Sequence, residues 1–341
     1  MTAIAETAER LIASGRGILA LDEDGATMNA RLSAAGVPAS ADAPRVFREL
    51  LVTTPGLARG VSGVLLGQDS FGQFLADGRP FGRAVAGLGM LPGVRADAGA
   101  RPLAGGCGET VTEGLDGLRE RLTRYVLMGA RFAVWRATFR AGGGRPSWAA
   151  LRANAHLLAR YAAACLELGL LPVAETRVLT DGCHAIGQAA NAAAAVLLAT
   201  VVELQDLGVR LDRVVLCLNM VAPGAEAAEP ALPEDVAGRT ACALTGLVPR
   251  EVAGVALACE GQLPGQATAS LALIARRGTP CPVTFSFGPA LTGPALAAWR
   301  GGPGRVRAAQ HALANRVACN VAALHGNYAP VFERSYVLAP A

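Results

Sequence analysis

The stretch that decides the fold runs from residue 131 to residue 176 and reads RFAVWRATFRAGGGRPSWAALRANAHLLARYAAACLELGLLPVAET. Two short runs in it, FAVWRA at residues 132–137 and LPVAET at residues 171–176, are almost continuously apolar. Such runs are typical of parallel strands that are buried on both faces. Residues 147–167 between them have the pattern of a helix, after a Gly/Pro-rich loop. The stretch therefore predicts a strand, a helix and a second strand parallel to the first.

The same unit recurs along the whole chain. Eight apolar runs are predicted to be strands, at residues 17–22, 63–68, 92–97, 132–137, 171–176, 213–219, 254–259 and 283–288. Helical patterns occupy residues 44–53, 112–128, 147–167, 184–205, 234–247, 267–276, 291–300 and 305–324. This alternation predicts an α/β fold, a (β/α)8 TIM barrel, formed by a single domain over residues 1–341.

The composition is that of a protein with a large core. Hydrophobic residues make up 52% of the 341 residues and charged residues 17%, which argues against disorder. A net charge of +4 with scattered arginines gives no reason to expect a nucleic-acid or membrane partner. The first 16 residues do not resemble a signal peptide, and no segment is predicted to span a membrane. The eight cysteines are therefore expected to be free thiols in a reducing compartment, the cytoplasm.

The sequence contains no lysine, since all 31 residues counted as lysine or arginine are arginines. A lysine side chain is the usual source of the amine that forms a Schiff base with a carbonyl substrate. A base composition that favours arginine codons explains part of this bias. It does not explain the loss of a lysine that a reaction needs.

Polar side chains stand where the predicted strands end. In a TIM barrel the carboxyl ends of the strands form the active site. The residues found there are Asp22, Gln68, Arg95, Asp97, Arg136, Glu175, Cys217, Asn219, Cys259 and Ser286. Any one of them is explained equally well as the start of a loop, but a ring of them indicates a site.

Several longer motifs resemble one family. They are GRGILALDED (residues 15–24), DGRPFG (77–82), RPLAGGCGETVTEGLDGLRER (101–121), FAVWR (132–136), NAHLLARYAAAC (154–165), NMVAPG (219–224) and TFSFGPAL (284–291). Together they resemble the class I fructose-bisphosphate aldolases, over residues 15–319. The resemblance implies a TIM barrel, a homo-oligomer and a C-terminal tail of about 20 residues. No cofactor and no metal are expected. In that family the tail ends in a tyrosine; Tyr336 is close to the terminus but not at it.

The resemblance implies that part of the family's site is kept. Asp22 matches the first-strand aspartate, Glu175 a fifth-strand glutamate that transfers protons, and Arg136 the fourth-strand arginine. Arg31 matches a further arginine, and Arg95 replaces a lysine while keeping its charge. Arg31, Arg95, Arg136 and Thr27 are thus expected to form a cationic corner that binds an anion, and Ser286 is a further candidate for substrate contact.

The losses cluster elsewhere. The lysine that forms the family's iminium is Cys217 here, a second catalytic lysine is Val134, and a second carboxylate is Arg177. Cys259 replaces a serine, Glu260 a glycine, and Pro289 an arginine. These last three lie where the family holds the phosphate beside the ketone, and Glu260 would repel it. We therefore expect a substrate with at most one anionic end, not a bisphosphate.

Cys217 and Cys259 follow neighbouring strands and have four possible roles. They could be small buried residues, Cys217 could be a nucleophile, the pair could form a disulfide, or either could bind a metal with Asp22 or Glu175. No CxxC-type spacing supports a metal site. His184, in the motif DGCH, is interpreted as a structural loop residue.

Three functions compete. An aldolase that works by the family mechanism is excluded because the chain has no lysine, unless the α-amine of Met1 forms the Schiff base. A repurposed enzyme would use Glu175 as base, Asp22 to orient or protonate, Cys217 as an optional nucleophile and the arginines to hold a sugar-like small molecule; specialised metabolism would be a natural setting, by analogy. An inactive pseudo-aldolase would bind a ligand or a protein. An open, polar barrel mouth favours the enzyme, and a mouth filled with apolar side chains favours the pseudo-aldolase.

Overall fold

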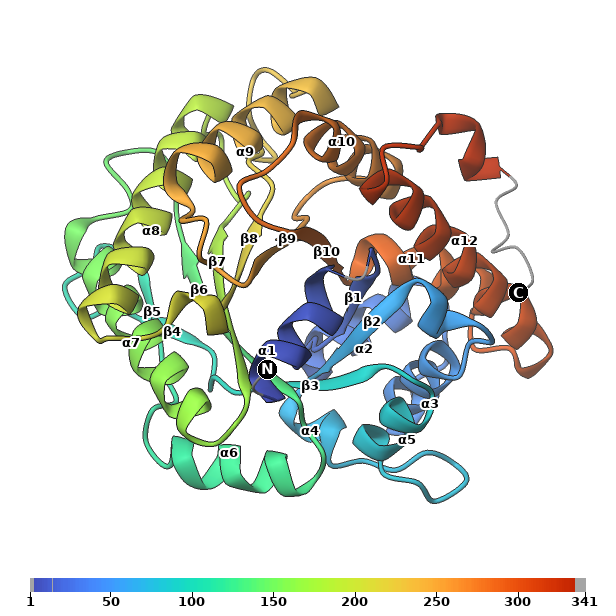
Figure 1. Cartoon of the computed structure of the whole chain (residues 1–341). Helices are drawn as coiled ribbons and strands as arrows, with labels where there is room; N and C mark the ends of the chain where they lie inside the picture. The colour runs from blue at the N-terminus through green and yellow to red at the C-terminus, as the bar shows by residue number, and fades with distance from the viewer. Residues whose placement is uncertain (1–2, 14, 335–341) are drawn as a thin grey trace.

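A computed structural model describes residues 3–13 and 15–334 of the chain. Eight parallel strands close into a barrel in the order β1-β10-β9-β8-β7-β6-β3-β2, which confirms the predicted TIM barrel (Figure 1). The strands are β1 (Gly17–Leu21), β2 (Val61–Leu66), β3 (Leu91–Arg95), β6 (Phe132–Phe139), β7 (Leu171–Val178), β8 (Val215–Asn219), β9 (Gly254–Ala258) and β10 (Val283–Phe287). Each of the eight predicted runs overlaps one of them, although β2 and β3 begin earlier and β6 and β7 end later than predicted.

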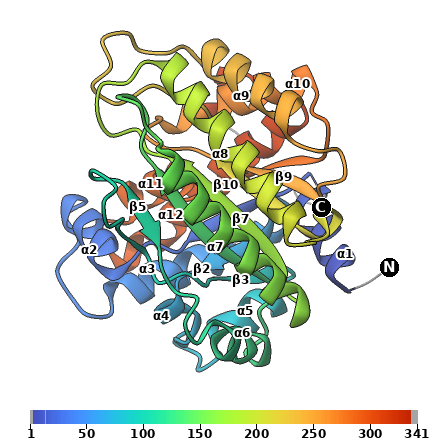
Figure 2. The same ribbon diagram turned by 90° about the vertical axis from the view of Figure 1, so that its left-hand side faces the viewer.

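Helices surround the barrel and cover its outer face. They are α2 (Gly25–Ala34), α3 (Ala43–Val52), α4 (Gln68–Phe71), α5 (Phe81–Gly87), α6 (Leu118–Leu127), α7 (Trp148–Glu167), α8 (Ile186–Asp206), α9 (Pro233–Leu247), α10 (Pro264–Arg277), α11 (Pro289–Trp299) and α12 (Val306–Leu324). Figure 2 shows α7 and α8 lying against β7 on one side of the barrel. Of the described helices, α8 alone is long and apolar enough to cross a membrane, but it is packed between α7 and α9 in this ring.

The N-terminal segment closes one end of the barrel. Helix α1 (Ala3–Ala8) and the π-helical turn that follows it (Glu9–Ala13) lie across the opening in Figure 1. Leu11 and Ile12 are buried among the inward-facing side chains of the strands. Gly63 and Gly254 make room for them, because a Cβ there would stand 2.6 Å from Leu11 and 2.4 Å from Ile12. The opposite end, where the strands have their carboxyl termini, stays open.

The sequence prediction was wrong in one helix. Residues 112–128 were expected to be helical, but Thr110–Thr112 form β5, an antiparallel partner of β4 (Ala100–Pro102). Gly114 and Gly117 then adopt positive φ angles of 124° and 62°, which L-residues disfavour and which break a helix. The helix therefore begins at Leu118. The helices at 3–13 and 25–34 were not predicted.

Candidate active site

The site is built on one row of side chains at the open end of the barrel. In the register of the parallel strands, Arg136 on β6 pairs with Glu175 on β7, which pairs with Cys217 on β8. Residues paired across neighbouring strands point to the same side of the sheet. Arg136, Glu175 and Cys217 therefore form one layer inside the barrel, directly above the apolar layer that contains Val134 and Val173.

A chain of alternating charges crosses this layer. Arg136 Nη2 donates a 2.7 Å hydrogen bond to Asp22 Oδ2, and its Nε lies 2.9 Å from Glu175 Oε2. Arg177 Nε donates to Glu175 Oε1 at 2.8 Å, and its Nη1 lies 3.1 Å from Glu260 Oε2. The order is thus Asp22, Arg136, Glu175, Arg177, Glu260, with opposite charges adjacent throughout. From the sequence, Arg177 was interpreted as the loss of a carboxylate, yet it links Glu175 to Glu260 in this chain.

The predicted cationic corner is also paired internally. Arg95 makes three hydrogen bonds of 2.9–3.0 Å to Asp97, and its Nη1 lies 4.0 Å from Asp22. Arg31 binds both carboxylate oxygens of Glu23 and the Thr292 hydroxyl. No arginine of the corner is therefore unpaired, because the neighbouring acidic residues neutralise each of them.

Thr27 also has an internal partner. Its backbone N–H donates a 2.8 Å hydrogen bond to Oδ1 of Asp24, the N-cap residue of α2. A carboxylate of the protein thus occupies the N-terminus of this helix, a position that suits an anion.

Glu175 is ionised and is a weak base in this arrangement. Burial by itself would raise the pKa of its carboxyl group, but the adjacent Arg136 and Arg177 lower the pKa to about 2. Its side chain is 3% exposed. The geometry therefore fits a residue that holds two arginines in place better than the proton acceptor expected from the sequence.

The two cysteines are free and occupy different surroundings. Cys217 is buried and packs against the apolar layer below it, and burial, together with the charge of Glu175, raises the pKa of its thiol. Cys259 lies at the cavity wall, and burial raises its pKa to about 12. Neither thiol is ionised near neutral pH, which disfavours a nucleophilic role. Among residues 3–13 and 15–334, no three His, Cys, Asp or Glu side chains are grouped to hold a metal.

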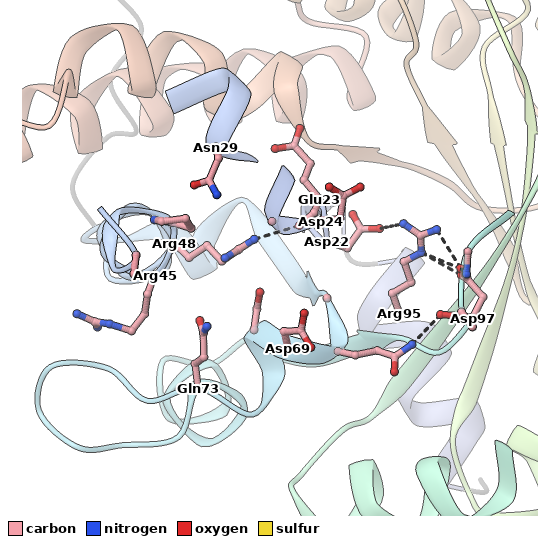
Figure 3. Close-up of a pocket in the computed structure, with 18 of the residues that line it drawn as sticks. Asp22, Glu23, Asp24, Asn29, Arg45, Arg48, Asp69, Gln73, Arg95 and Asp97 are labelled. Atoms are coloured by element: carbon pink, nitrogen blue, oxygen red, sulfur yellow. Dashed lines mark hydrogen bonds and ion pairs between the residues drawn. The ribbon is translucent and has the colours of Figure 1, made fainter. Parts of the chain in front are cut away.

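Two cavities open beside the charged chain. The first, of about 320 Å³, lies over the end of the barrel, and seven of the predicted site residues line it: Asp22, Thr27, Arg95, Arg136, Cys259, Glu260 and Ser286. Arg31, Glu175 and Cys217 are not in its wall. The second cavity, of about 690 Å³, lies between α2, α3 and α4, and shares Asp22, Glu23, Asp24 and Arg95 with the first. Figure 3 shows Arg95 in the second cavity's wall between Asp22 and Asp97.

Residues that the sequence did not single out hold these walls together. Arg48 on α3 is buried and donates to the backbone oxygens of Leu21 and Glu23, which fixes the end of β1 (Figure 3). An arginine in an amphipathic helix gave no signal of this role. His184 is buried in a loop, where its backbone carbonyl accepts a hydrogen bond from the backbone N–H of Gly224. It lines neither cavity. Tyr336 lies outside the described residues.

A closed (β/α)8 barrel with facing acids and arginines at the carboxyl ends of its strands belongs to the large class of TIM-barrel enzyme folds. Residues 3–337 match the family model of class I fructose-bisphosphate aldolase. The chain belongs to the class I fructose-bisphosphate aldolase family.

Known members of the family are similar over nearly the whole chain. A probable class 1 fructose-bisphosphate aldolase of Xanthomonas campestris is 42% identical over 297 residues, 87% of this chain and 89% of the relative. The cytosolic fructose-bisphosphate aldolase 6 of Arabidopsis thaliana is 41% identical over 316 residues, 92% and 88% of the two chains. The solved aldolase of Plasmodium falciparum, in a complex with TRAP and a small-molecule inhibitor, superposes with a TM-score of 0.92 at 33% identity, over 96% of this chain and 95% of that one.

Proposed function

We propose that this family member is a lyase-type enzyme that works without a lysine imine, on a sugar-like small molecule with one anionic end. The observation that carries the proposal is the open cavity of about 320 Å³, whose wall contains Asp22, Arg136, Arg177 and Glu260. A protein that had filled its barrel mouth with apolar side chains would have no such space. The reactions that fit are proton transfer, elimination, and the cleavage or formation of a C–C bond, in a specialised metabolic pathway.

The absence of an imine follows from the residues available. The sequence has no lysine, and the resemblance assigns the position of the reactive amine to Cys217. A thiol adds to a ketone to give a thiohemiketal, which does not delocalise electrons as an iminium does. Cys217 is moreover 2% exposed and packs with apolar neighbours such as Val134. Cleavage by the family mechanism is therefore not expected.

The roles of the two acidic residues are assigned by their access to the cavity. Asp22 lines the cavity and contacts Arg136, so it is the group proposed to exchange a proton with the ligand. Glu175 does not line it and is proposed to position Arg136 and Arg177. This differs from the role of general base that the sequence suggested for Glu175.

The proposal is tested by binding and by turnover. Thermal-shift screening against sugar monophosphates, amino sugars and fructose bisphosphate should reveal a monoanionic ligand, and NMR of the mixture should show its conversion. Asp22→Asn should bind the same ligand and lose conversion at least about a hundredfold, the usual contribution of a general acid or base. Borohydride added with a ketose phosphate should leave the protein mass unchanged. A covalent adduct, or fructose bisphosphate seated with both phosphates bound, would overturn the proposal.

A second candidate function is a pseudo-aldolase that binds without turnover. It is favoured by one observation, the apolar packing of Cys217 and Val134, two residues that stand where the resemblance expects amines. A ligand that stabilises the protein but is not converted, with Asp22→Asn behaving like the parent protein, would support this alternative. For either function we propose a cytoplasmic homo-oligomer without cofactor, in keeping with the family.

A further inference from the structure

The contact between Arg177 and Glu260 joins two strand ends across the cavity. Glu260 follows β9, and the next residue, Gly261, has a φ of 68° and packs against Thr180 beyond the end of β7. This left-handed turn brings the Glu260 carboxylate to 3.1 Å from Arg177 Nη1. Both side chains line the cavity, and they remain 26% and 23% exposed. The pair is therefore reachable by a ligand in the cavity.

The other arginines of the mouth are held more firmly. Arg136 contacts two carboxylates that are 5% and 3% exposed, those of Asp22 and Glu175. Arg95 is bound through two nitrogens to Asp97, whose side chain is fully buried. Arg177, by contrast, has one fixed partner, Glu175, and one partner on a loop. Of the arginines in the described part of the cavity wall, Arg177 is the one whose carboxylate partner is easiest to displace.

The loop that carries Glu260 has unsatisfied polar atoms. Within the described part of the chain, Glu260 Oε2 and Gln262 Oε1 are both buried and accept no hydrogen bond. The Arg177–Glu260 contact thus brings opposite charges together without the geometry of a hydrogen bond. A buried acceptor without a donor, such as Gln262 Oε1, is unfavourable, so a ligand that rearranges this loop breaks no hydrogen bond at that atom and loses only the ion pair at Glu260 Oε2.

We propose that Arg177 is the anion-recognition residue of this cavity, and that Glu260 occupies the anion's place until a ligand displaces it. The incoming group is a single carboxylate or phosphate, bound by the planar Arg177 guanidinium, whose fork of N–H donors suits both. Glu260 then turns toward solvent. The inference rests on the proposed function in one respect, that this cavity is where the ligand binds. The ion pair with Arg177 also explains why the negative charge of Glu260, which was expected from the sequence to repel an anion, is tolerated in this cavity: Arg177 neutralises it.

Calorimetric titration with inorganic phosphate tests this directly. Glu260→Gln should bind phosphate about threefold more tightly than the parent protein, because the competing ion pair is partly exposed and weak. Arg177→Gln should bind it at least about tenfold more weakly, the loss expected for a charge-assisted hydrogen bond. The double variant should bind like Arg177→Gln, so that the gain from Glu260→Gln disappears without the arginine. Arg177→Lys keeps the charge beside Glu175 but not the fork of donors, so it should bind phosphate more weakly than the parent protein and more tightly than Arg177→Gln, which separates loss of the anion site from loss of folding.

Glu9→Gln is the control, since it removes one negative charge at the closed end of the barrel and should leave phosphate binding unchanged. The proposal is wrong if neither the parent protein nor Glu260→Gln binds phosphate, if Glu9→Gln tightens binding as much as Glu260→Gln, or if the gain persists without Arg177. None of these measurements requires turnover. A protein that binds phosphate as described but converts no sugar would therefore contradict the proposed enzyme and leave the assignment of Arg177 intact.

Discussion

Replacing Glu175 by glutamine removes the carboxylate that separates two arginines inside the barrel. Glu175 contacts Arg136 at 2.9 Å and Arg177 at 2.8 Å. Glutamine has nearly the same shape but no charge. The variant therefore leaves two guanidinium groups facing each other in a largely buried layer, with Asp22 and Glu260 as their remaining partners.

The magnitude follows from the burial of this contact. Removing one partner from a buried ion pair costs about 3–5 kcal/mol, because an uncompensated charge stays behind. For a chain of 341 residues, the entropy of unfolding is about 0.7 kcal/mol per degree. The melting temperature of Glu175→Gln should therefore fall by about 4–7 °C at pH 7.

The effect should also depend on pH. The pKa of Glu175 is about 2, compared with 4.5 for an unperturbed glutamate. A carboxyl group with a lowered pKa stabilises the folded state above its unfolded pKa, and this stabilisation is lost as the pH falls toward the folded value. The difference between the parent protein and Glu175→Gln should therefore be constant above pH 5 and shrink as the pH falls from 4.5 toward 2.

Thermal melts followed by far-UV circular dichroism, run from pH 7 to pH 3, measure both quantities. Glu167→Gln is the matched control, because Glu167 pairs with Arg119 on the exposed surface and should show neither effect. A Glu175→Gln variant that melts within 1 °C of the parent protein, or whose deficit is the same at pH 3.5 and pH 7, would refute the reasoning.

Two further predictions concern the barrel interior. Iodoacetamide should modify exposed cysteines such as Cys107 in the native protein, whereas Cys217 should react only after unfolding, because burial raises the pKa of its thiol and blocks access to it. Peptide mass spectrometry measures both reactions. Labelling of Cys217 in the native protein would contradict the packing described. Gly93→Ala should lower the free energy of unfolding, measured in urea, by about 2 kcal/mol or more, because the new Cβ would stand 2.1 Å from the Phe132 ring. Gly87→Ala is the control and should be neutral or slightly stabilising, because a Cβ there would meet nothing within 4 Å. Equal stabilities of the two variants would contradict this account.

The barrel was predictable from the sequence because its strands are buried on both faces. Apolar runs such as 132–137 and 171–176 are then nearly continuous, and their spacing repeats eight times. The N-terminal helix was not predictable in the same way. Its role depends on Leu11 and Ile12 entering spaces that Gly63 and Gly254 leave open, and those glycines are distant in the sequence. The failure at residues 112–117 has a local cause, the two glycines with positive φ angles.

The positions of the candidate residues around the barrel mouth could be predicted from the sequence, but the way their charges pair could not. Most of the candidates do line one cavity, because the ends of parallel strands meet there. Which charges pair depends on side-chain directions and loop positions. One signal was available: Arg177 lies two residues after Glu175 on the same strand, so both point to the same side of the sheet. The pairing of Arg177 with Glu260 depends on a loop turn that no periodicity indicates.

Each arginine in the wall of the cavity at the barrel mouth already contacts a carboxylate of the protein, and an anion must compete with that carboxylate to bind. A buried guanidinium without a partner is costly, and the cavity wall accordingly contains three arginines and four acidic residues. An anion that enters must replace an internal carboxylate, so the exchange yields only a small net gain in charge interaction. The first exchange, at Arg177, displaces a partly exposed loop residue, whereas a second would have to open the buried contacts of Arg136 or Arg95. This difference in burial, together with the missing cation at Pro289, is the reason why we propose a ligand with one anionic end and not a bisphosphate; on that proposal the uncharged part of the ligand supplies most of the selectivity.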